Sequence, residues 1–171
     1  MLRRIALVAL LLAFGTGAAP APPKITRVVI KKKDHSLALL AGNDVVRSYR
    51  AAVGPGAPGF KVQEGDETTP VGRYHVTAHQ PSKYRMFLRL DYPNAEDRAR
   101  FARLKHESKL AADATIGGDI GIHGPPVKMP ELLKPTLKLT DWTLGCIAVN
   151  DDEIQEIARL VKDGTDVVIE E

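Results

Sequence analysis

Cys146 is the only cysteine of the 171-residue chain, and its neighbours fit a chemical role. It lies in the stretch Asp141–Asn150 and directly follows Gly145. A thiolate is a strong nucleophile, and a glycine beside it lets the backbone come close to a substrate carbonyl. The amide groups of Gly145 and Cys146 are therefore candidate donors to a developing oxyanion.

A thiol nucleophile needs a base, and His123 is the candidate. Ile120 and Ile122 alternate with a glycine and this histidine, as on a strand with one packed face. Gly121 and Gly124 lie on either side of Ile122-His123 and leave open space for a substrate. Pairing with imidazole lowers a cysteine pKa from about 8.5 to roughly 3.5–7.5. The sequence thus predicts a thiolate at neutral pH.

Structural alternatives exist for both residues. Free cysteine is often an inert core residue, and Cys146 has no partner for an internal disulfide. His123 can likewise be a structural histidine. His75 and His79 are four positions apart, but on the predicted strand they have no acidic partner spaced for zinc. We therefore expect neither a metal site nor a cofactor.

The first 21 residues have the order of a secretory signal peptide. A basic start at Met1–Arg4 precedes an apolar run at Ile5–Phe14 and small residues at Gly15–Ala21. The apolar run is well short of the roughly 20 residues that span a bilayer. We expect export to the periplasm or cell envelope, with an uncleaved N-terminal anchor as the alternative, and a single domain over 22–171.

Composition argues against a nucleic-acid partner. The formal net charge of +3 includes Arg3 and Arg4, so the predicted mature chain is close to neutral. Aromatic residues make up only 5% of the chain, which disfavours a stacking platform for single strands. The run Lys31–Lys33 is more typical of a solvated strand end.

The predicted fold is mostly β with peripheral helices, an α+β class. Gly42 and Asn43 indicate a tight hairpin, because both tolerate a positive φ. Asn94 is a predicted helix cap, and Asn150 with Glu153 resembles a capping box. The run 125–140 is either a plain connector or a lid over a cleft. Expected strands cover 26–32, 36–41, 45–53, 73–79 and 165–169, and expected helices cover 95–105 and a segment from Asn150 to a stop near Gly164.

Several short motifs together resemble the L,D-transpeptidase catalytic domain (YkuD/ErfK family), and the YafK-like subgroup in particular. The resemblance covers about residues 26–170 and implies a β-sandwich or barrel-like catalytic domain that acts on bacterial cell wall. The motifs are Gly65 with Thr69-Pro70-x-Gly72, Tyr92-Pro93-Asn94, Ile122-His123-Gly124 and Trp142-Thr143-Leu144-Gly145-Cys146-Ile147.

The resemblance also implies a reaction. In the family, the cysteine attacks the diaminopimelate–D-alanine bond of a peptidoglycan stem peptide, D-alanine leaves, and an amine or water resolves the thioester. Carried over, Cys146 is the nucleophile and His123 the general base and later acid. The amides of Gly145 and Cys146 form the oxyanion hole, and Thr143 takes the Ser/Thr place of the motif. A backbone carbonyl orients the histidine in many members, and no cofactor is needed.

Two departures from the family pattern leave the second half-reaction open. Leu144 stands where many members have histidine, and Ala148 where many have arginine. Arg85 or Arg89 is the candidate replacement, and Thr143 and Gly124 are further candidates for substrate binding. The expected activity is transfer to an amine. The alternatives are hydrolysis of a stem peptide or of a link to a wall-attached protein, and a non-catalytic wall-binding protein.

Overall fold

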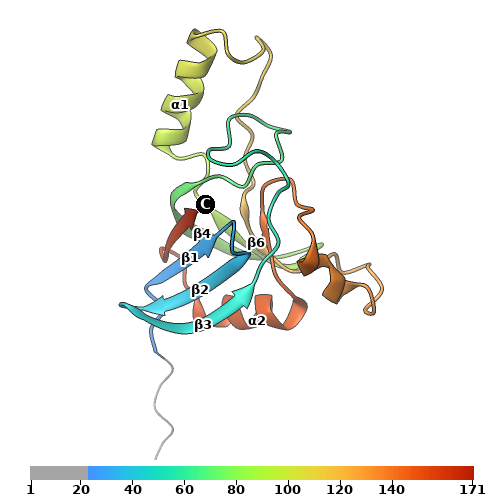
Figure 1. Cartoon of the computed structure of the whole chain (residues 1–171). Coiled ribbons are helices and arrows are strands. Elements are labelled where there is room, and N and C mark those ends of the chain that lie inside the picture. Colours follow the sequence, from blue (N-terminus) through green and yellow to red (C-terminus); the bar gives the residue numbers. More distant parts are fainter. Residues whose placement is uncertain (1–22) are drawn as a thin grey trace, which may run out of the picture.

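The structure, a computed structural model, describes residues 23–171 and is organised around one mixed sheet (Figure 1). The expected signal segment 1–21 lies outside the described residues. The order of strands across the sheet is β3-β2-β1-β8-β4-β5-β6-β7. The strands are β1 Arg27–Lys31, β2 Ser36–Ala41, β3 Asp44–Arg50, β4 Gly72–Ser82, β5 Arg85–Leu90, β6 Gly121–His123, β7 Ile147–Ala148 and β8 Asp166–Glu170.

The first three strands form an antiparallel meander, in which β2 and β3 make the hairpin that the sequence predicts. Gly42 adopts a φ of +64° in the turn between β2 and β3, a conformation that glycine reaches without a Cβ clash. Val28 pairs with Leu39 and Ile30 with Leu37, and all four side chains are fully buried. The period-two alternation of apolar residues therefore directs one face of this half of the sheet into the core.

The C-terminal strand β8 joins the two halves of the sheet. It runs parallel to β1 and antiparallel to β4, so Val167 lies beside Val28 on one side and Tyr74 on the other. The second half, β4 to β7, carries the residues with candidate chemistry. Leu88 on β5 and Ile122 on β6 pair with each other and are completely buried.

Two helices begin where their capping residues predict. In α1 (Ala95–His106), the Asn94 side chain accepts from the backbone N–H of Asp97, whose own side chain accepts from Asn94 N–H. In α2 (Asp151–Leu160), Asn150 and Glu153 form the predicted capping box. That helix ends before Gly164, which instead occupies the turn into β8 with a φ of +81°.

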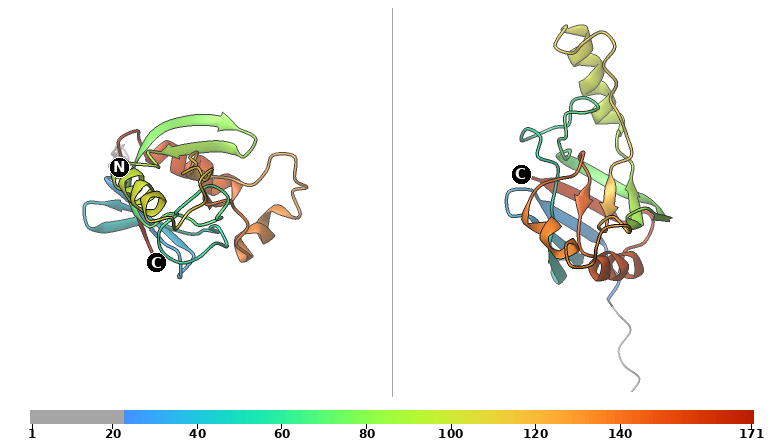
Figure 2. Two further views of the ribbon diagram at one scale, coloured as in Figure 1. Left: turned by 90° about the horizontal axis from the view of Figure 1, so that it is seen from above. Right: turned by 90° about the vertical axis from the view of Figure 1, so that its right-hand side faces the viewer.

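The two helices differ in what they cover. Ile154 and Ile157 of α2 are fully buried in the core beneath the sheet. In contrast, α1 projects from the body of the molecule (Figures 1 and 2), and its only buried residue is Asp97. Its apolar side chains Phe101 and Leu104 are only half-buried. No helix within residues 23–171 has the length and apolar character needed to cross a bilayer.

Truncation of Ile122 tests the packing of the second half of the sheet. Ile122→Ala should lower the free energy of unfolding in urea by about 2–5 kcal/mol, because it leaves a cavity between β5, β7 and the core. Val45→Ala is the matched control on an exposed strand position, with an expected loss below about 0.5 kcal/mol. Equal losses for the two variants would contradict this arrangement of the core.

Candidate active site

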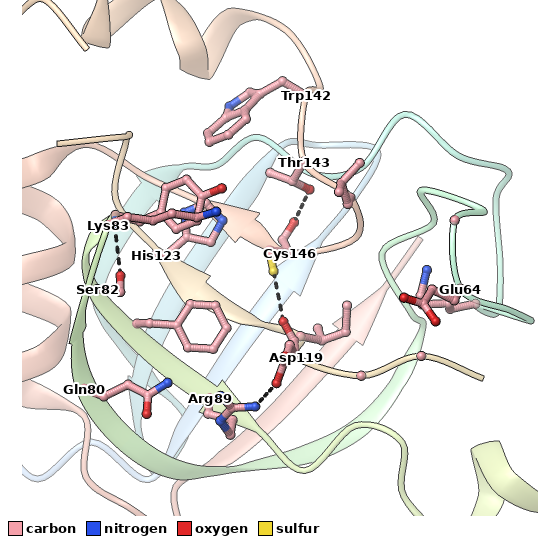
Figure 3. A pocket seen from close by; sticks show the side chains of 18 residues that line it. Glu64, Gln80, Ser82, Lys83, Arg89, Asp119, His123, Trp142, Thr143 and Cys146 are labelled. Atoms are coloured by element: carbon pink, nitrogen blue, oxygen red, sulfur yellow. Dashed lines mark hydrogen bonds and ion pairs between the residues drawn. The ribbon is translucent and has the colours of Figure 1, made fainter. Parts of the chain in front are cut away.

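A cavity of about 750 Å³ opens on the face of the sheet opposite the core, over β4, β5 and β6 (Figure 3). Both Cys146 and His123 line it. The strand register places Phe87 of β5 opposite His123 and Arg89 opposite Gly121, so these residues share the cavity face. The lining residues are Lys61, Glu64, Gly65, Gln80, Ser82, Lys83, Tyr84, Phe87, Arg89, Gly117, Gly118, Asp119, Ile120, His123, Trp142, Thr143, Leu144 and Cys146.

Strand pairing brings the cysteine to the histidine. β7 runs parallel to β6, with Ile147 beside Ile122 and both side chains buried. Cys146 precedes Ile147 and therefore lies next to Gly121, with its side chain on the same face as His123. The two residues are 23 positions apart in sequence, and this parallel ladder is what places them in one cavity.

The turn before Cys146 requires its glycine. Gly145 has a φ of +122°, and a Cβ there would lie 2.8 Å from the Thr68 carbonyl oxygen. The Thr143 hydroxyl donates to the Cys146 carbonyl at 2.7 Å, and the Thr69 hydroxyl donates to the same oxygen at 3.3 Å. Thr143 thus holds the backbone of Cys146, in addition to lining the cavity, and Thr69 assists from the facing loop.

His123 has the tautomer that a general base needs. Its Nδ1 lies 2.7 Å from the Gly124 carbonyl oxygen, which can only accept, so Nδ1 carries the proton and Nε2 keeps its lone pair. Burial lowers the pKa of His123, although this hydrogen bond opposes the shift. Gly124 is not among the residues that line the cavity, so it acts here through its carbonyl and not as a substrate contact.

Aromatic rings enclose the histidine. Tyr84 stacks on it with ring centroids 4.4 Å apart, and Trp142 meets it edge-on at 5.6 Å. Phe87 lies nearly parallel to the imidazole at 6.1 Å. Sequence reasoning assigned no role to these three residues. Trp142 could have been found from its place in the motif that ends at Ile147. Phe87 is revealed only by its pairing with His123, a register that cannot be read from a three-residue strand.

The cysteine is a thiol in the free protein, which corrects the expected thiolate. Burial raises the pKa of Cys146 to about 11; the Gly121 amide opposes this, while the Asp119 charge reinforces it. The Sγ atom donates to the Asp119 carbonyl at 3.4 Å, and within residues 23–171 no hydrogen bond joins it to His123. Without a direct imidazole partner, desolvation decides the protonation state.

The two expected oxyanion donors are not equivalent. The Gly145 N–H donates to the Thr143 hydroxyl at 3.2 Å and is therefore occupied. The Cys146 N–H has no acceptor within the described part of the chain. The Cys146 amide is the donor left free for a tetrahedral intermediate, and Gly145 contributes mainly through its backbone conformation.

The two candidate arginines are separated by the structure. Arg89 lines the cavity, where its guanidinium pairs with Asp119. Arg85 does not line it, because its Nε and Nη2 bind the Asp151 carboxylate at 2.8 and 3.3 Å. Arg85 therefore lies outside the cavity, on the Asp151 carboxylate.

The two positions that depart from the family pattern also differ. Leu144 is 73% exposed and lines the cavity, whereas Ala148 is buried against Ala52.

None of the residues in 125–140 lines the cavity, which favours a connector over a lid. His75 lies beside Asp91 and Asp166, and His79 beside Asp163; residues 23–171 contain no cluster suited to a metal ion.

Lys61, on the loop that faces Cys146, also escaped the sequence reasoning. Its ammonium group is almost completely buried and lies 2.5 Å from the Asp66 carboxylate. Burial would raise the pKa of Asp66, but Lys61 and the backbone N–H groups of Val62, Gln63 and Thr68 hold it below its usual value. The ammonium group of Lys61 thus lies at the cavity wall, with its charge balanced by the Asp66 carboxylate behind it.

Comparison with known proteins agrees with this geometry. The profile of the L,D-transpeptidase catalytic domain (YkuD) matches residues 25–169. No curated protein matches the chain.

Solved structures share the fold. The helical cell shape determining protein Pgp2 from Campylobacter jejuni superposes with a TM-score of 0.63 at 24% identity, over 87% of this chain and 48% of that one. Bd1075 from Bdellovibrio bacteriovorus superposes with a TM-score of 0.55 at 22% identity, over 85% of this chain and 48% of that one.

An L,D-transpeptidase from Xylanimonas cellulosilytica gives a TM-score of 0.53 at 16% identity, over 91% of this chain and 65% of that one. The chain spans about half the length of Pgp2 and of Bd1075. The family profile covers nearly the whole described chain and includes Cys146, His123 and the β-rich core that carries them. The chain belongs to the L,D-transpeptidase catalytic domain family.

Proposed function

We propose that the protein is a cysteine L,D-transpeptidase that acts on peptidoglycan stem peptides in the periplasm or cell envelope. One observation supports this most directly. The Cys146 thiol and a His123 ring of the correct tautomer line one cavity, beside a free backbone N–H at Cys146. A nucleophile, a base and an oxyanion donor are the parts that acyl transfer needs.

The first half-reaction follows from these positions. Nε2 of His123 accepts the thiol proton while Sγ of Cys146 attacks the scissile carbonyl carbon. The Cys146 N–H stabilises the resulting oxyanion. The intermediate then collapses, the C–N bond breaks, and the His123 imidazolium donates its proton to the leaving D-alanine amine. A thioester on Cys146 and neutral His123 remain.

The second half-reaction transfers the acyl group. His123 accepts a proton from an incoming amine, the amine attacks the thioester, and the proton returns to Sγ. Hydrolysis is the second candidate, since water can follow the same path. The partial exposure of Cys146 in an open cavity favours this alternative, because water can reach the thioester.

Substitution of the two central residues tests the proposal. Cys146→Ala should abolish product formation from defined tetrapeptide muropeptides, and His123→Gln should slow it by about 10²- to 10⁴-fold. His106→Gln is a matched control, since this exposed histidine lies at the end of the projecting helix α1 and does not line the cavity. Product masses with and without an acceptor amine distinguish cross-linking from trimming. Full activity of Cys146→Ala would contradict both candidate functions.

The raised pKa of Cys146 has its own consequence. The thiol is protonated at neutral pH, so alkylation of the free protein should be slow there and rise about tenfold per pH unit toward a midpoint near 11. Iodoacetamide labelling followed by intact mass reports this residue alone, because the chain has one cysteine. A plateau already reached below about pH 8 would show a preformed thiolate and overturn this resting state.

A further inference from the structure

A chain of contacts connects Arg89 to Cys146 through Asp119, and Figure 3 shows the three residues one after another along the cavity. The Arg89 guanidinium pairs with the Asp119 carboxylate. The backbone carbonyl of the same Asp119 accepts the hydrogen bond of the thiol at 3.4 Å. One loop residue therefore links a cavity cation to the nucleophile.

Asp119 is held in this place by few contacts. Its φ of +55° lies in the left-handed region, which is unfavourable for residues other than glycine, asparagine and aspartate. Gly117, with a φ of +74°, and Gly118 precede it, so the loop has little intrinsic stiffness. The Asp119 side chain is 79% exposed, and an ion pair this exposed is weak. Another carboxylate can therefore compete for Arg89.

Arg89 lies where such a carboxylate would arrive. Strand β5 places it opposite Gly121, next to the cysteine, and its guanidinium packs over the Phe87 ring at 5.6 Å. A guanidinium fork binds carboxylates in a bidentate manner. Consider a stem peptide whose scissile bond lies next to a free carboxylate. When the scissile carbonyl of that peptide reaches Sγ of Cys146, its carboxylate would lie on the Arg89 side of the cavity.

We propose that Asp119 is a positioning residue that keeps the thiol on its carbonyl and away from His123 until a substrate carboxylate takes Arg89 from it. The Asp119 loop then relaxes, the thiol turns to Nε2 of His123, and the proton transfer of the first half-reaction begins. This inference rests on the proposed function, since it assumes a peptide substrate with a carboxylate near the scissile bond.

The surrounding charges determine the sign of the expected effect. Asp119 raises the pKa of Cys146, whereas Lys61 and Arg89 lower it. Asp119→Asn removes the negative charge of Asp119 and releases Arg89 from its ion pair. Both changes favour the thiolate form of Cys146. The titratable and charged side chains that face the cavity with the thiol are Lys61 and Glu64 from the 54–71 loop, Lys83 and Tyr84 from the β4–β5 turn, Arg89 from β5, Asp119, and His123 from β6.

The test compares alkylation of Cys146 in Asp119→Asn, wild type and Asp113→Asn. Asparagine tolerates the left-handed conformation, and Asp113 is an exposed acidic residue of the same connection that does not line the cavity. At about pH 8, Asp119→Asn should react with iodoacetamide about tenfold faster than wild type, the rate equivalent of one pKa unit. Asp113→Asn should stay within about twofold. The KM for tetrapeptide muropeptides should fall severalfold in Asp119→Asn only.

An unchanged or slower alkylation rate in folded Asp119→Asn would overturn the proposal, because a purely structural role predicts no gain in thiol reactivity. A second measurement needs no variant. Excess acetate should accelerate the alkylation of the wild-type protein by occupying Arg89, and acetamide should not. Equal alkylation rates with acetate and with acetamide would also overturn the proposal. Labelling requires no turnover, whereas the proposed function is tested by turnover of muropeptides by wild type and Cys146→Ala, so the two failures are distinguishable.

Discussion

The parallel pairing of β6 with β7 is the interaction on which the site depends. It is short, with Ile122 beside Ile147 and His123 beside Ala148. Its strength comes from the two isoleucines, which are fully buried, and from the backbone bonds between Ala52 and Ala148 on the far side. Because side chains alternate across a strand, burial of these isoleucines turns His123 and Cys146 together toward the cavity.

Several further contacts serve that pairing. Thr143 and Thr69 hold the carbonyl of Cys146, and Gly145 allows the close approach of the Thr68 backbone. The Gly124 carbonyl and the ring of Tyr84 hold His123 in one orientation. Burial also favours the neutral forms of both His123 and Cys146. In the proposed mechanism, reactivity arises when substrate enters and releases the Asp119 contact.

Local signals in the sequence predicted the elements well. Gly42 marked the hairpin, and the caps at Asn94 and Asn150 marked the starts of both helices. Cys146 and His123 were recognisable because their neighbours are motif residues close in sequence. Tyr84 and Asp119 were not, because they reach the site only through strand register and loop conformation. The pKa of Cys146 was mispredicted because burial, a tertiary feature, raises it, and the Asp119 charge adds to the effect.

The central claim is that Cys146 carries the acyl group of a stem peptide. The most direct measurement is the intact mass of the protein, quenched with acid within the first turnover on a tetrapeptide muropeptide and mapped by peptide digestion. The expected result is an acyl thioester on Cys146 whose added mass equals that of the muropeptide minus one D-alanine molecule. An adduct on another residue, or product formation with no adduct on Cys146, would contradict it.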